Sequence, residues 1–222
     1  ETGRIASTLY LVSTSFLPID SNQPSEQTLR LVASELSHGR LVAYPTDTLY
    51  GLAADPCNAS AVDRIYRMKA RSLLAPLPLI AANLEQIRVC VKSLSPLSYQ
   101  LAERFWPGPL TLIYDAGETL APAMLAGGKT VAVRVPAHPV AMGIARVFGH
   151  PITATSANLA GVEPVNDASA MAKELSDDLS MILDGGPTPG GLPSTIVDAR
   201  GLQPMLIREG IVPWERVLQS LA

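Results

Sequence analysis

One segment decides how this chain folds: Leu41-Val42-Ala43-Tyr44-Pro45-Thr46-Asp47-Thr48-Leu49-Tyr50-Gly51-Leu52. Residues 41–44 form an apolar run of strand length, which predicts a buried strand. Pro45 ends that strand, and the polar residues of 45–52 stand between two apolar stretches. Because binding groups are often placed where a strand gives way to a loop, we expect this turn to contribute to a site.

Apolar runs of strand length alternate with amphipathic helical stretches along the sequence, which is typical of an α/β fold. Several successive strands are joined by segments too short for a parallel crossover, and this predicts a mixed sheet. The predicted strands are 41–44, 77–82, 110–114, 131–135, 152–155, 181–183, 195–198 and 205–207. The predicted helices are 24–38, 59–69, 83–89, 96–104, 139–147, 168–175 and 213–221.

The composition is that of a well-packed protein, because 47% of the 222 residues are hydrophobic and only 17% are charged. We expect a single domain over residues 1–222, with Glu1-Thr2-Gly3 left over from cloning. Two isolated cysteines, Cys57 and Cys90, favour a reducing, cytoplasmic location and are interpreted as core residues or inert thiols. The formal net charge of -3 disfavours a nucleic acid as the primary ligand.

Basic residues within or at the ends of predicted elements are the first candidates for a binding site. Lys69 and Arg71 lie at the end of a predicted helix, where they either cap its last carbonyls or clamp phosphate groups. Arg134 interrupts an apolar strand and by alternation shares a face with Ala132, so it needs a partner or a ligand unless that face is exposed to solvent. Arg208 ends another apolar strand in a similar way.

Small polar residues and glycines follow other strands. Residues 153–158, Thr-Ala-Thr-Ser-Ala-Asn, suit either a capped turn or close contact with a ligand. The glycine-rich segment 184–195 suits tight turns or backbone contact with an anion. Residues 128–130, Gly-Lys-Thr, lead into a strand instead of a helix, so a P-loop is rejected. The histidines have no metal-ligand spacing, and motifs typical of zinc proteases, serine hydrolases and dinucleotide oxidoreductases are missing.

Several short motifs occur in a defined order along the chain. They are Pro45-Thr46-Asp47-Thr48-Leu49-Tyr50-Gly51-Leu52, Lys69-x-Arg71, Trp106-Pro107-Gly108-Pro109-Leu110-Thr111, Arg134-Val135-Pro136, Ser156-Ala157-Asn158 and Ser194-Thr195-Ile196-Val197-Asp198. As an ordered set over about residues 27–210, they resemble the YrdC/TsaC family of threonylcarbamoyl-AMP synthases in its short, single-domain form. The resemblance implies an α/β fold with a twisted, mixed parallel and antiparallel sheet, flanked by helices around a large concave cavity.

The reaction implied by this resemblance joins L-threonine, bicarbonate or CO2, and ATP into threonylcarbamoyl-AMP and pyrophosphate. The product would pass to a separate tRNA threonylcarbamoyl transferase complex, which makes threonylcarbamoyladenosine in tRNA. Mg2+ is expected on the nucleotide phosphates, without a ligand from the protein. By resemblance, the ATP ligands are Lys69, Arg71, Thr130, Ser156, Asn158 and Arg208, with Lys69 and Arg71 also catalytic, and the threonine ligands are Thr46, Arg134 and Ser194.

Two other functions stay open. The same cleft could bind double-stranded RNA or tRNA through phosphates, although the acidic balance and the 5% aromatic content leave few platforms for base stacking. The second alternative is a related enzyme that forms a different carbamoyl-adenylate. A weak contact with tRNA is compatible with the synthase as well, and no contact with a membrane is expected, because no apolar run is long enough to cross a bilayer.

Overall fold

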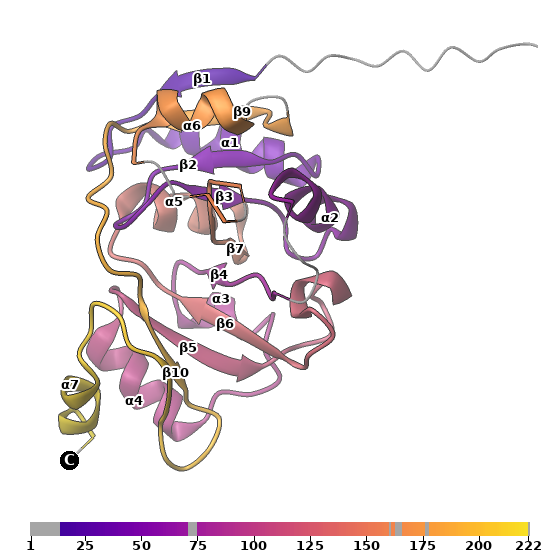
Figure 1. Cartoon of the computed structure of the whole chain (residues 1–222). Helices are drawn as coiled ribbons and strands as arrows, with labels where there is room; N and C mark the ends of the chain where they lie inside the picture. The colour runs from indigo at the N-terminus through magenta and orange to yellow at the C-terminus, as the bar shows by residue number, and fades with distance from the viewer. Residues whose placement is uncertain (1–13, 71–74, 160, 163–165, 176–177, 222) are drawn as a thin grey trace, which may run out of the picture.

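The computed structural model describes residues 14–70, 75–159, 161–162, 166–175 and 178–221. Within these residues the strands form two mixed sheets, which lie one above the other in Figure 1. The predicted α/β fold with mixed strand pairing is confirmed. The division of the strands into two sheets was not predicted from the sequence. None of the described helices combines the length and the apolar character needed to span a bilayer.

The first sheet has the strand order β1-β9-β2-β3-β8. Its strands are β1 (Ser15–Pro18), β9 (Met181–Asp184), β2 (Val42–Tyr44), β3 (Gly51–Ala53) and β8 (Thr155–Ser156). Strand β9 is parallel to β1 and β2, whereas β3 is antiparallel to β2 and β8. Sequence reasoning missed β1 and β3; β3 is short, has no β-branched side chain and depends on its pairing with β2.

The second sheet has the strand order β11-β10-β5-β6-β4-β7. Its strands are β11 (Met205–Arg208), β10 (Thr195–Asp198), β5 (Leu110–Asp115), β6 (Thr130–Arg134), β4 (Leu79–Ile80) and β7 (Ile152–Thr153). Parallel pairs (β10 with β5, β4 with β6) alternate with antiparallel pairs along the sheet. This alternation is the mixed pairing that the short connections predicted.

Hydrophobic clusters cover both sides of strand β2. Helices α1 (Glu26–Ser37) and α5 (Pro139–Phe148) pack with Val42 and Tyr44 of β2, while Ala43 of the same strand belongs to the larger cluster formed with α2 (Ala59–Met68), α4 (Pro96–Phe105) and α6 (Ala168–Leu175). Strand β2 is therefore covered on both sides, as its apolar run predicted. The remaining helical elements are α3 (Leu84–Ile87), η1 (Pro122–Leu125) and α7 (Trp214–Gln219).

Residues 152–156 connect the two sheets. Sequence reasoning expected one strand here, but the chain pairs with β4 up to Thr153 and with β3 from Thr155 onward, so Ala154 separates β7 from β8. The Thr153 side chain is fully buried; its Oγ1 donates to the Leu52 carbonyl at 2.8 Å and accepts from the Ala54 N–H at 2.8 Å. A strand of the second sheet is thereby bonded to the backbone of the first.

Thr153→Val tests this link with an almost isosteric change. We expect the free energy of unfolding to fall by about 1–3 kcal/mol, because the buried Ala54 N–H and Leu52 carbonyl lose a hydrogen-bond partner that water cannot replace. Urea unfolding followed by circular dichroism measures the change. Thr119→Val is the matched control: its exposed hydroxyl donates to the Val89 carbonyl, and its loss should cost at most about 0.5 kcal/mol. Equal losses in both variants would contradict the structural role of Thr153.

Candidate functional site

A cavity of about 670 Å3 lies between the two sheets. Its walls include residues of β2, β3 and β8 from the first sheet and of β4, β5, β6, β10 and β11 from the second, together with the segment after β2 and the segment before β10. The volume falls within the roughly 300–1,000 Å3 that is usual for small-molecule sites. The concave cavity that the resemblance implied is therefore present.

Most of the predicted site residues meet at this cavity. Lys69 and Asn158 are exceptions, because they lie behind the cavity wall, bonded to Ser156. Arg71 lies outside the described residues. The predicted residues that line the cavity are Thr46, Thr130, Arg134, Ser156, Ser194 and Arg208.

Alternate residues of strand β6 face the cavity. Thr130, Ala132 and Arg134 line the cavity, whereas Val131 and Val133 are buried in the larger hydrophobic cluster. Successive side chains of a strand point to opposite faces, so the apolar residues hold the strand while the alternate residues face the ligand space. The predicted sharing of a face by Arg134 and Ala132 is confirmed.

Arg134 forms a two-pronged ion pair with Asp47. Its Nη1 donates to Oδ2 and its Nη2 donates to Oδ1, both at 2.9 Å, and the side chains are 10% and 20% exposed. This pairing offsets the cost of burying the charges. Arginine has five N–H donors, so the Arg134 guanidinium retains donors beyond the two that Asp47 occupies. The sequence analysis gave Asp47 no role. Asp47 lies in the motif 45–52, and a buried arginine needs an anionic partner, so this pairing could have been considered.

The turn after β2 is organised by the hydroxyl of Thr46. Its Oγ1 accepts from the backbone N–H groups of Thr48 at 3.1 Å and Leu49 at 3.2 Å, and it donates to the Leu49 carbonyl at 2.6 Å. A threonine that bonds to its own turn in this way holds the backbone in a defined shape. Asp47 is thereby presented to Arg134 from a rigid turn and not from a flexible loop.

Lys69 is buried beneath the turn that follows β8. Its Nζ donates to the carbonyl of Ser156, to the carbonyl of Asn158 at 2.6 Å and to the Asn158 side-chain oxygen at 3.1 Å, while the Ser156 hydroxyl also donates to that oxygen at 2.5 Å. Lys69 therefore shapes this part of the cavity wall from behind. These contacts differ from the alternative prediction, in which Lys69 would cap the last carbonyls of its own helix.

Arg208 is the cation at the open edge of the second sheet. It is exposed, its Nη2 donates to the Ser194 carbonyl at 2.9 Å, and it forms no salt bridge with any residue that the structure describes. Partial burial against the wall lowers the pKa of Arg208, but an arginine stays charged at neutral pH. Ser194 is held by a 2.8 Å hydrogen bond between its Oγ and the hydroxyl of Thr111.

Tyr50 ties the glycine-rich segment to the turn after β2. Its hydroxyl donates to the Gly186 carbonyl at 2.7 Å and accepts from the Gly185 N–H at 3.2 Å, and burial raises its pKa to about 12. Gly186, Gly190 and Gly191 adopt positive φ, which favours the tight-turn interpretation of this segment. Gly191 also lines the cavity, so a backbone contact with a ligand stays a prediction.

His138 lies close enough to Arg134 and Asp47 for both charges to influence its pKa, and it was not predicted as part of the site. Its buried Nδ1 has no hydrogen-bond partner among the described residues, and as the N-cap of α5 its side chain caps no N–H group. Burial lowers the pKa of His138 below its ordinary value of 6.5, the Arg134 charge lowers it further, and Asp47 opposes both. The imidazole is therefore neutral at neutral pH.

The sequence of this chain is similar to that of one protein family. The family model for Sua5/YciO/YrdC, described as "Telomere recombination", matches residues 34–210. A threonylcarbamoyl-AMP synthase of Pyrococcus abyssi is 38% identical over 86% of this chain and 56% of its own length. A threonylcarbamoyl-AMP synthase of Photobacterium profundum is 36% identical over 77% of this chain and 94% of its own length.

A solved structure shares the fold closely. The crystal structure of P. abyssi Sua5 complexed with L-threonine superposes with a TM-score of 0.87 at 36% identity, covering 94% of this chain and 61% of that one. The present chain thus spans little more than half the length of its Pyrococcus relative.

The neutral His138 makes the stability of the fold dependent on pH. Below about pH 6.5 the unfolded chain binds a proton at this histidine that the folded protein resists, so the free energy of unfolding should fall as the pH decreases through that region. His138→Asn removes the titration and offers a side chain that caps helices. We expect this variant to lose less stability than the parent between about pH 7 and pH 5.5 in urea unfolding.

The control for this experiment is His38→Asn, which replaces an exposed histidine. It should keep the pH dependence of the parent protein. If His138→Asn shows the same loss of stability on acidification as the parent, the partly buried imidazole is not the cause.

Proposed function

The chain belongs to the Sua5/YciO/YrdC family, and from this premise we propose that it is a threonylcarbamoyl-AMP synthase. The proposed reaction consumes L-threonine, bicarbonate or CO2, and ATP, and it yields threonylcarbamoyl-AMP and pyrophosphate. Support comes from the names of the relatives, above all the Photobacterium synthase, whose length the chain matches over 94%. The product would serve a tRNA threonylcarbamoyl transferase complex, as part of the same proposal.

The observation that carries this proposal is the convergence of distant polar residues on one cavity. Thr46, Arg134 and Arg208 come from the turn after β2, the end of β6 and the end of β11, and all three line the same 670 Å3 space. Such a cavity has room for an amino acid beside a nucleotide. A surface for RNA would instead be expected to present an exposed basic face, and the formal net charge of -3 offers little for it.

We assign the amino-acid end of the cavity to Arg134, with Thr46 and Ser194 near it. The threonine carboxylate would accept hydrogen bonds from the N–H groups of Arg134 that Asp47 does not use. Asp47 holds the guanidinium plane in place before the substrate arrives, so little rotamer freedom is lost on binding. The L-threonine bound to P. abyssi Sua5 supports an amino-acid site in this fold.

We assign the nucleotide end to Ser156, Thr130 and Arg208, with Lys69 and Asn158 behind Ser156. Arg208 would pair with phosphate oxygens through guanidinium N–H groups other than the one that Nη2 donates to the Ser194 carbonyl. The buried Lys69 charge adds a positive potential to the wall formed by Ser156, although Lys69 itself does not line the cavity. Arg71 stays a predicted phosphate ligand and catalytic residue, as does Lys69.

Mg2+ would accompany the nucleotide. The described residues that line the cavity include hydroxyls but neither Asp nor Glu. Phosphate oxygens and water would therefore supply most ligands to the ion, which is common for Mg2+. The ion would neutralise phosphate charge; the protein's part is to position the triphosphate.

The chemistry requires no nucleophile from the protein. The threonine amine adds to CO2 and loses a proton, which gives a carbamate; a carbamate oxygen then attacks the α-phosphorus, and the bond from that phosphorus to pyrophosphate breaks. The protein would contribute by holding the reactants in line and by presenting fixed donors to the phosphate charge. Apolar wall residues such as Leu49, Ile80 and Ile196 would keep water away from the reactive mixed anhydride.

Omission of single substrates tests the reaction. We expect pyrophosphate release only when ATP, L-threonine and bicarbonate are all present, with threonylcarbamoyl-AMP identified by mass spectrometry. Pyrophosphate release without threonine would instead indicate a different carbamoyl-adenylate former. No turnover together with tight, salt-sensitive binding of double-stranded RNA would indicate the RNA-binding module.

Two arginine substitutions test the assignment of the two ends. Arg134→Ala should weaken L-threonine binding more than ATP binding, and Arg208→Ala should do the reverse, because a charge-assisted hydrogen bond contributes about 1.5–3 kcal/mol. Isothermal titration calorimetry with each ligand measures both constants. Arg30→Ala is the matched control, since Arg30 is exposed on α1 and makes only a weak i,i+4 contact with Glu26. Equal losses of both ligands in Arg134→Ala would contradict the division.

A further inference from the structure

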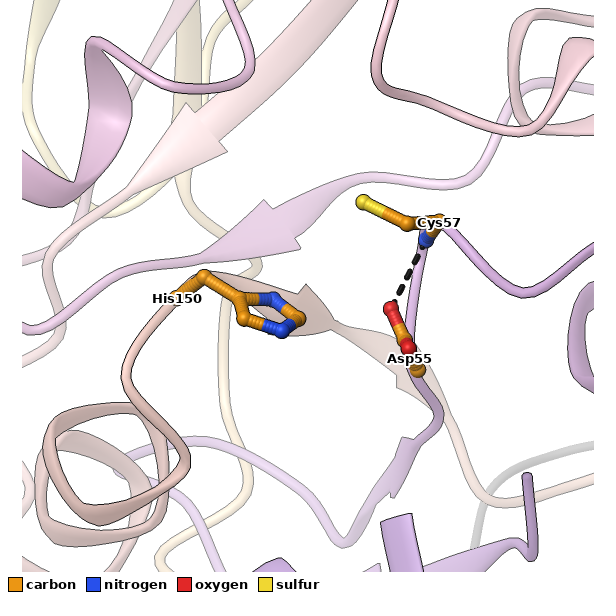
Figure 2. Close-up of side chains that lie close together, drawn as sticks. All are labelled: Asp55, Cys57 and His150. Atoms are coloured by element: carbon orange, nitrogen blue, oxygen red, sulfur yellow. Dashed lines mark hydrogen bonds between the residues drawn. The ribbon is translucent and has the colours of Figure 1, made fainter. Parts of the chain in front are cut away.

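A cluster outside the cavity joins three side chains of different chemistry. Asp55, Cys57 and His150 each offer a ligand atom, and these atoms all lie within 4.8 Å of one another. Figure 2 shows the imidazole of His150 directed toward Asp55 and Cys57, which are close neighbours in one loop. None of the three lines the cavity, so the cluster has no part in the proposed synthase site.

The backbone holds the two halves of this cluster close together. Asp55 and Cys57 follow β3, and His150 lies two residues before the start of β7. The Thr153 N–H donates to the Ala54 carbonyl at 3.1 Å, and the Thr153 hydroxyl bonds to the same stretch of backbone. The position of His150 relative to Asp55 is therefore set by the link between the two sheets.

The side chains are also oriented for an ion. Asp55 Oδ1 accepts from the Cys57 N–H at 2.8 Å, which fixes the carboxylate and leaves its second oxygen available. His150 Nδ1 lies 3.3 Å from the Pro151 carbonyl, and a hydrogen bond there selects the tautomer with a free lone pair on Nε2. Asp55 forms no salt bridge within the described residues, so its charge is not neutralised by a protein cation there.

We propose that Asp55, Cys57 and His150 bind a zinc ion, with water as the fourth ligand. Thiolate, imidazole and carboxylate are the ligands that zinc takes, at about 2.3 Å for sulfur and about 2.0–2.2 Å for nitrogen and oxygen. In a tetrahedron these bond lengths place neighbouring ligand atoms about 3.5 Å apart. All three ligand atoms lie within 4.8 Å of one another, so binding a zinc ion would require the atoms to approach by at most about 1.3 Å.

The two cysteines have different surroundings. Cys90 is buried in the core, as expected, but Cys57 is exposed and lies beside a histidine that is distant in the sequence. The hard cations Mg2+ and Ca2+ prefer sites built from oxygen alone, so a site with a thiolate and an imidazole selects zinc or a chemically similar transition metal. The ion would cross-link the loop after β3 to the segment before β7.

Cobalt binding to the untagged full chain tests the site directly. Co2+ replaces Zn2+ in such sites and reports a thiolate ligand by a charge-transfer band in the near ultraviolet. We expect the parent chain to show this band, Zn2+ to abolish it by displacement, and Zn2+ to raise the thermal midpoint of unfolding. Cys57→Ser should lack the band, and His150→Gln should bind Co2+ at least about tenfold more weakly.

Two matched variants serve as controls. Cys90→Ala removes the other cysteine and His38→Gln removes an exposed histidine; both should keep the band and the zinc-dependent rise of the midpoint. Circular dichroism tests whether Cys57→Ser is folded, which we expect because the Cys57 side chain is exposed. The proposal is overturned if the parent shows no band with excess Co2+, if Cys57→Ser keeps it, or if Cys90→Ala loses it. Failure of the synthase assay would leave this result unaffected, because the two sites share no residue.

Discussion

The buried hydroxyl of Thr153 is the interaction on which the arrangement of the two sheets depends. Thr153 belongs to β7, yet its hydroxyl donates to the carbonyl of Leu52, which is in β3. The same hydroxyl accepts from the N–H of Ala54, the residue after β3. A buried backbone group without a partner is costly, so this threonine restricts where the second sheet can lie. Ala154, which separates β7 from β8, lines the cavity between the two sheets, so the cavity lies next to this connection.

The cations around the cavity are positioned before a ligand binds. Arg134 is held by Asp47, Lys69 by the carbonyls after β8, and Arg208 by the Ser194 carbonyl. Each contact fixes a donor and lowers the reorganisation that binding or reaction would otherwise require. The three cations differ in their surroundings. Lys69 is buried, Arg134 retains N–H groups that Asp47 does not occupy, and Arg208 is exposed. The three cations thus range from a buried charge to one that is exposed to solvent.

Sequence patterns predicted elements best where local and tertiary preferences agree. The run at 131–135 was predicted as a strand with Arg134 on the face of Ala132, and both features hold because alternation is a property of the strand itself. A helix was predicted over 83–89, and α3 begins directly after Asn83, whose side chain accepts from the Gln86 N–H at 3.0 Å. In contrast, β3 exists only through its neighbours, and the strand at 152–155 was divided because its two ends pair with different sheets.

The sequence by itself determined the α/β class, the strand and helix periodicities, and the polar residues at strand ends, because these follow from the local alternation of side chains. Only the tertiary structure decided which of those residues meet. The pairing of Arg134 with Asp47, the place of Lys69 behind Ser156 and the approach of His150 to Cys57 all join segments that are distant in the chain. Such contacts depend on how whole sheets pack, and no local pattern encodes that packing.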